Sequence, residues 1–222
     1  MTSSFPRILV ALLVTILLLS PSSSAFETPL SEEAVREAYF LGQRRDETLA
    51  RFLDKYTRHL PPPESGPYIA SVTFLTPFAL AAQLSSRRSA GYSAQQAQID
   101  HRKHKEIVRI VVQIDLTESY GPFVSQPADS RSGSATSYVL RPYDFWKDFD
   151  VRAFSSEKAL IPIRSWGEPN ESCSPEGGCI LTGATLYLDF RADAFASDSA
   201  AVDVIPPEGN PVSVDFDLSA LR

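Results

Sequence analysis

Residues 179–218, CILTGATLYLDFRADAFASDSAAVDVIPPEGNPVSVDFDL, contain three segments in which apolar and polar side chains alternate with a period of two. These segments are 179–191, 201–205 and 211–218. Consecutive strand side chains point to opposite faces of a sheet, so each segment predicts a strand with one buried and one solvated face. In the last segment the pattern places Phe216 inward, with Asp215 and Asp217 outward.

The rest of the chain supplies four further strand candidates, so about seven strands are expected. They are 68–84, 107–117, 138–154 and 159–164. Turn-forming residues separate them, and no repeat is visible. The pattern predicts a mainly β protein with N-terminal helices (α+β class), built as an antiparallel β-sandwich, with an immunoglobulin-like arrangement as one option. An irregular two-sheet or barrel architecture is the alternative.

The first 25 residues have the pattern of a secretory signal peptide. Arg7 precedes an apolar run at 8–19 that is broken only by Thr15, and the small residues Ser23 and Ala25 suit cleavage after Ala25. An uncleaved membrane anchor is the alternative, but the run of about 12 residues is short for a membrane span. No second such run follows, so we expect no membrane span after signal cleavage and a secreted or periplasmic location.

We divide the remainder into an N-terminal helical segment at 26–66 and a β-sandwich domain at 67–222. Apolar residues spaced three and four apart predict helix over 28–60, bent or broken near Gly42. A second, shorter helix is expected at 94–104, where a capping box precedes it.

Cys173 and Cys179 are the two cysteines of the chain, and they flank a turn-forming stretch with one proline and two glycines. Export permits a disulfide. We therefore expect a disulfide that closes the hairpin leading into the 179–191 strand. A redox pair and a pair of metal ligands are the alternatives, but the spacing matches neither C-x-x-C nor a common zinc knuckle.

The net charge of −6 and the absence of a large basic cluster argue against nucleic acid and anionic membranes as partners. His101 and His104 lie three residues apart on a predicted helix, a spacing that can chelate a metal, with Asp100 or Glu106 assisting. Neighbouring cations repel a metal ion and favour a solvated basic helix face instead. These cations are Arg102, Lys103 and Lys105.

Two carboxylate pairs and one aromatic segment are further candidates. Asp215 with Asp217, and Asp148 with Asp150, are interpreted as solubilising residues, with a calcium site or a glycosidase pair as alternatives. The aromatic residues of 143–154 are interpreted mainly as core, with a carbohydrate or peptide platform as the alternative.

Neither a G-x-S-x-G nor an H-E-x-x-H motif is present. We assign no catalytic residue, metal or cofactor. The expected function is an exported, non-enzymatic β-sandwich protein with a binding or structural role in the cell envelope or outside the cell, for which a protein or a carbohydrate is a possible partner. The alternatives are an exported hydrolase with an unrecognised site, and a carrier of apolar ligands with a cavity between the helices of 30–60 and the sheet.

The signal-peptide prediction has a direct test. The exported protein should begin at Phe26, because the small residues before it fit the specificity of a signal peptidase. N-terminal sequencing of the exported protein checks this, and a protein that still begins at Met1 would support the membrane anchor.

Overall fold

The computed structural model describes residues 25–44, 46–88, 91–126 and 137–222. Within these ranges the chain is mainly antiparallel β-structure arranged as several open sheets. The predicted signal peptide at 1–25 lies outside the described residues, except for Ala25. The strand order does not confirm an immunoglobulin-like arrangement.

The larger sheet has the strand order β1-β2-β3-β9-β8, and a second sheet has the order β11-β10-β6-β7. The strands of the larger sheet are β1 (Thr57–His59), β2 (Tyr68–Leu75), β3 (Ile107–Asp115), β8 (Arg164–Cys173) and β9 (Cys179–Arg191). The second sheet contains β6 (Asp150–Ser155), β7 (Lys158–Leu160), β10 (Ser199–Ile205) and β11 (Val212–Asp217). A separate ribbon pairs β4 (Phe123–Gln126) with β5 (Ser137–Leu140).

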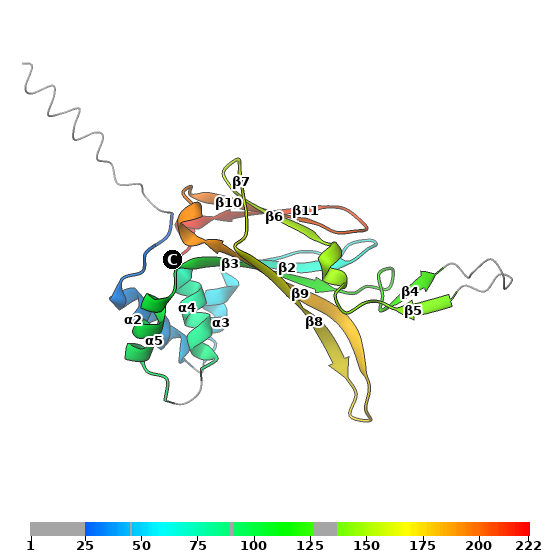
Figure 1. The fold of residues 1–222 in the computed structure, drawn as a ribbon, viewed down its shortest axis with the longest axis horizontal. Helices are drawn as coiled ribbons and strands as arrows, with labels where there is room; N and C mark the ends of the chain where they lie inside the picture. Colours follow the sequence, from blue (N-terminus) through cyan, green and yellow to red (C-terminus); the bar gives the residue numbers. More distant parts are fainter. Residues whose placement is uncertain (1–24, 45, 89–90, 127–136) are drawn as a thin grey trace, which may run out of the picture.

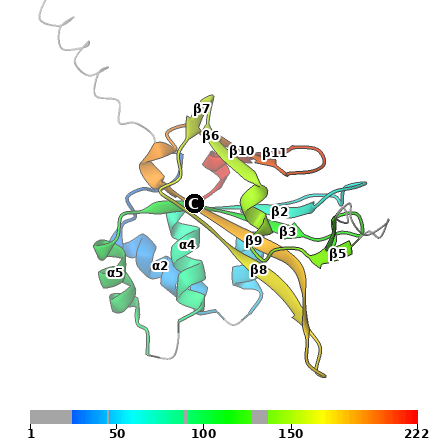
Figure 2. The ribbon, with the colours of Figure 1, turned by 45° about the vertical axis from the view of Figure 1, so that its right-hand side comes forward.

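Four helices accompany the sheets in the described residues. They are α2 (Glu32–Gly42), α3 (Thr48–Asp54), α4 (Pro77–Ser86) and α5 (Ala94–Lys103). Three short 3₁₀ turns, η1 (Phe145–Asp148), η2 (Ala192–Ala194) and η3 (Leu218–Ala220), complete the elements. Figures 1 and 2 show the helices on one side of the five-stranded sheet and the four-stranded sheet on the other.

The two larger sheets share one hydrophobic core. Phe74 of β2, Ile110 of β3 and Leu188 of β9 belong to the same buried cluster as Val202 of β10 and Phe216 of β11. Phe216 is only 1% exposed, whereas its neighbour Asp215 is exposed, so the orientation predicted from the alternation is confirmed.

The helices form a second buried cluster of their own. Ser31 caps α2 by accepting a hydrogen bond from the Ala34 amide. The predicted break near Gly42 is confirmed, because α2 ends there and α3 begins at Thr48. A Cβ at Gly42 would lie 2.2 Å from the carbonyl oxygen of Ala82, so glycine is what allows α2 and α4 to approach.

The strand predicted over 68–84 is wrong in its second half. β2 ends at Leu75, and α4 begins at Pro77, where proline suits the first helical position. The Thr76 hydroxyl accepts a hydrogen bond from the Ala79 amide and caps this helix. The apolar residues of 78–84 therefore lie on a helix that is buried over most of its surface.

Other boundaries also need correction. The described residues form eleven strands instead of about seven. The helix predicted over 28–60 stops before β1, and the strand predicted over 138–154 divides into β5, η1 and β6. The strand predicted at 159–164 is β7, only three residues long. β8 was not among the seven strand candidates, although the expected hairpin leading into 179–191 implies a partner strand and β8 pairs with β9 along ten residues.

The pairing of β8 with β9 contains a register shift between Asn170 and Glu171. This shift interrupts the alternation of buried and exposed residues near the start of β9. The alternation of the sequence places Ile180 on the same face as Leu186 and Leu188, which are buried. Beyond the shift Leu181 is buried instead, and Ile180 is 47% exposed. An irregularity of this kind adds one residue to one strand and thereby exchanges the faces of the following residues.

The predicted disulfide between Cys173 and Cys179 is confirmed. The two residues are paired across β8 and β9, and their Cα atoms lie 4.0 Å apart. The bond therefore closes the turn of the long β8–β9 hairpin, which projects away from the helices in Figure 1. Among the helices of the described residues, none is both long and apolar enough to cross a membrane.

Phe216→Ala should cost about 3–5 kcal/mol of unfolding free energy, because it leaves a cavity between the two sheets. The matched control is Asp215→Ala on the solvated face of the same strand, with an expected change below about 0.5 kcal/mol. Asp217 is less suitable, because its carboxylate accepts hydrogen bonds from the amide and hydroxyl of Ser219. Urea denaturation measures both changes, and a larger loss for Asp215→Ala would show that β11 is not half-buried in solution.

Candidate functional site

A half-open pocket of about 630 Å³ lies between α4, α5 and the first residues of β3. We call it the α4–α5–β3 pocket. Its volume falls within the range of about 300–1,000 Å³ that is usual for small-molecule sites. One residue of α2, Val35, and one of the loop between β7 and β8, Ile163, also line it.

The inner surface of the pocket is largely apolar. Leu80 and Leu84 of α4 line it together with Ile107 of β3. Two of the apolar lining residues are strongly exposed: Leu84 at 44% and Ile163 at 58%. Large apolar side chains that stay exposed around a hollow are typical of binding sites.

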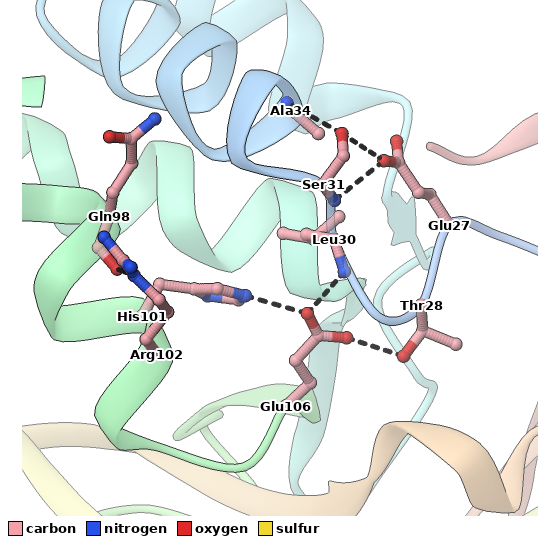
Figure 3. A network of polar contacts seen from close by, with 9 residues as sticks. All are labelled: Glu27, Thr28, Leu30, Ser31, Ala34, Gln98, His101, Arg102 and Glu106. Atoms are coloured by element: carbon pink, nitrogen blue, oxygen red, sulfur yellow. Dashed lines mark hydrogen bonds and ion pairs between the residues drawn. The ribbon is translucent and has the colours of Figure 1, made fainter. Parts of the chain in front are cut away.

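Glu106, in the short link between α5 and β3, organises the polar side of the pocket (Figure 3). Its carboxylate accepts a hydrogen bond from Nε2 of His101 at 2.8 Å and one from the Thr28 hydroxyl at 2.6 Å. The backbone amide of Leu30 donates a third hydrogen bond, also at 2.6 Å. Glu106 thereby joins α5 to the segment that leads into α2.

This network lowers the pKa of the Glu106 carboxyl. The Glu106 side chain is only 10% exposed. Burial raises the pKa of the carboxyl, but the hydrogen bonds from His101, Thr28 and the Leu30 amide outweigh it, so the pKa lies below its ordinary value of 4.5. The carboxylate is therefore charged near neutral pH, and its acceptor capacity is used within the protein.

An ion pair on the sheet side also borders the pocket. Arg109 of β3 donates two hydrogen bonds to the buried carboxylate of Asp189 on β9, at 2.6 and 2.9 Å. The guanidinium of Arg109 also lies 4.8 Å from the ring centre of Trp166, which stacks on Tyr187 at 4.9 Å. Such a bidentate pair fixes the Arg109 side chain in place.

The sequence did not identify this group. Arg109, Tyr187 and Asp189 fall on the polar parity of their predicted strands, which was read as the solvated face. The register that brings Arg109 opposite Asp189 depends on the pairing of β3 with β9. Only that register could have indicated that two oppositely charged residues meet at a partly buried position.

The two histidines that the sequence suggested as a metal-binding pair lie in different environments. Arg102 and Lys103 are exposed, as expected of a basic helix face, and His104 is exposed at the end of α5. His101 is different, because its side chain turns toward Glu106 and is only 23% exposed. The described residues contain no group of three or more side chains that could hold a metal ion.

The remaining sequence candidates lie away from this pocket. Phe145 and Phe149 of the aromatic segment are buried in the main core, whereas Tyr143 is exposed. Asp150 is paired with Arg152, and Asp217 caps η3. These aspartates therefore have local structural partners, and Phe145 and Phe149 are not available to a ligand.

No protein-family model matches this chain, and a search of curated proteins finds no significant match. The function is therefore argued from the pocket and its residues.

Glu106→Gln should lower the unfolding free energy at pH 7 by about 1–3 kcal/mol, because hydrogen bonds to a charged carboxylate are lost. The folded-state pKa of Glu106 is depressed, so its contribution is complete above the unfolded value of 4.5 and is lost as the pH falls through the folded value. The difference between Glu106→Gln and the wild type should therefore shrink below about pH 4.5.

Urea denaturation at a series of pH values between neutral and acidic measures this difference. The control is Glu157→Gln, which changes an exposed carboxylate in the turn between β6 and β7. A stability difference for Glu106→Gln that stays constant across the acidic range would contradict the charged hydrogen-bond network.

Proposed function

We propose that this protein is an exported, non-enzymatic binding protein that holds a small, partly apolar ligand in the α4–α5–β3 pocket. The observation that carries the proposal is the apolar inner surface, with Leu84 and Ile163 exposed at a pocket of suitable size. In this proposal the two larger sheets act as a sandwich-like scaffold that supports the helices around the ligand.

The proposal of export is supported by two features. The first is the signal-peptide pattern of the sequence, with cleavage proposed after Ala25. The second is the disulfide between Cys173 and Cys179, because disulfides persist mainly in oxidising compartments. Cleavage after Ala25 would leave Phe26 as the first residue, and its side chain is buried in the main core.

We propose binding instead of hydrolysis because the polar groups of the pocket already form hydrogen bonds within the protein. A hydrolase needs a nucleophile or an acid–base pair directed into its cavity. The Glu106 carboxylate instead accepts hydrogen bonds from three donors of the protein, including Nε2 of His101. Both cysteines are held in the disulfide. No specific observation in the described residues favours hydrolytic chemistry.

The proposal takes up the sequence hypothesis of an apolar-ligand carrier, with the pocket in a different place. That hypothesis put the cavity between the helices of 30–60 and the sheet. The pocket lies instead beside α4 and α5, and only Val35 comes from the earlier helices. The change follows from α4, a helix that the sequence pattern did not predict.

Fluorescence titration with N-phenyl-1-naphthylamine, a neutral apolar probe, tests the proposal. The wild-type protein should bind the probe, and Ile163→Asp should weaken binding about tenfold or more, because a charge replaces an apolar contact of the ligand. The matched control is Ile161→Asp in the same loop. Ile161 is 88% exposed and does not line the pocket, so affinity should be unchanged.

Both positions are exposed, so neither variant should unfold, and circular dichroism verifies this. Absence of probe binding to the folded wild-type protein would overturn the proposal. Equal losses of affinity in the two variants would place the probe outside the α4–α5–β3 pocket, with the same consequence.

A further inference from the structure

The α4–α5–β3 pocket is positively charged, although the protein as a whole carries a net charge of −6. Its lining includes two acidic residues, Asp100 and Glu106. Four cationic residues accompany them: Arg88, Lys103, Lys105 and Arg109. A local excess of one sign against the net charge of the molecule is a property of sites that attract a ligand of the opposite sign.

Both acids already have hydrogen-bond partners within the protein. Glu106 accepts hydrogen bonds from His101, Thr28 and the Leu30 amide. Asp100 accepts one from the side-chain amide of Gln96, and the ammonium of Lys103 lies 3.6 Å from its carboxylate. Neither carboxylate is therefore free to pair with the other cations of the pocket.

The four cationic residues differ in whether a carboxylate of the protein pairs with them. Arg109 is held by Asp189, so it contributes little net charge. Lys105 and Arg88 are exposed, and neither forms an ion pair with a side chain in the part of the chain that the structure describes. Lys105 lies near Asp193, but that carboxylate is hydrogen-bonded by Arg191. Four cationic against two acidic residues leave the lining with an excess of positive charge, and Lys105 and Arg88 are the two of these cations without an ion-pair partner in the described residues.

We propose that the ligand of this pocket is an amphipathic anion: a compound with one acidic group, such as a carboxylate, phosphate or sulfonate, on an apolar body. The acidic group binds at Lys105, beside the apolar lining of the pocket. The apolar body lies against Leu80, Leu84 and Ile163. This inference rests on the proposed function, because it assigns a ligand class to the same pocket.

Two probes that share one ring system separate the contribution of charge from that of apolar contact. N-phenyl-1-naphthylamine is neutral, and 1-anilinonaphthalene-8-sulfonate adds one sulfonate to it. The sulfonate probe should bind the wild-type protein about threefold to tenfold more tightly, because it gains charge-assisted contacts at a partly exposed site. Its affinity should fall with rising salt concentration, whereas that of the neutral probe should not.

Lys105→Gln should remove most of the preference for the sulfonate probe and leave the affinity for the neutral probe unchanged. The matched control is Lys55→Gln, which removes the same charge from an exposed position that does not line the pocket. Because Lys105 is exposed, its replacement should not affect folding. Competition with decanoate, decyl phosphate and 1-decanol then identifies which acidic group displaces the sulfonate probe best.

The outcomes separate the two proposals. If neither probe binds the folded protein, the proposed function fails. If the neutral probe binds and the sulfonate probe binds no more tightly, the pocket is retained and the anionic ligand is refuted. An equal effect of Lys105→Gln and Lys55→Gln on the sulfonate probe would also refute it, because the preference would then arise from net charge.

Discussion

The phenylalanine side chain at position 74 connects the parts of this fold. Its ring packs against Phe26 in the N-terminal segment, Phe195 after β9, and Phe216 of the second sheet, with ring centres 5.0 to 6.5 Å apart. Aromatic rings bury a large apolar area each, and such clusters dominate core energetics. The five-stranded sheet, the four-stranded sheet and the start of the described chain are therefore joined by one group of aromatic contacts, and the helices pack beside them with a buried cluster of their own.

The sequence predicted this scaffold where a strand has one buried face. The bounds of β9 are those predicted, because its polar and apolar residues alternate over most of its length. α4 was missed because nearly every residue of PFALAAQL is apolar. In such a segment the alternation of large and small side chains resembles the period of a strand. Its cap at Thr76 and the proline at position 77 were the signals that a helix starts there, and they were outweighed by the apparent period of two.

β8 was missed for a different reason. Its residues include Gly167, Pro169 and Asn170, which are typical of turns. It lies at the edge of the sheet, where a proline is tolerated because one side of the strand is unpaired. Gly167 is required there, because a Cβ would lie 2.4 Å from the ring of Trp146.

The pocket could not be predicted from the sequence either, since its lining comes from segments that only the tertiary fold brings together. The pocket exists because α5 packs on α2, whereas α4 packs on both α2 and β3. The close approach of α2 to α4 at Gly42 fixes the position of this helical group. α5 is joined to β3 by a short link that contains Glu106, and the carboxylate of Glu106 holds His101 of α5 and the Thr28–Leu30 segment before α2 at the same point. These hydrogen bonds to Glu106 thus hold α5 and the segment before α2 together at the start of β3. Lys105, the next residue toward α5, forms no ion pair in the described residues, so the same short link contributes both the carboxylate that connects the helical segments and an exposed cation of the pocket.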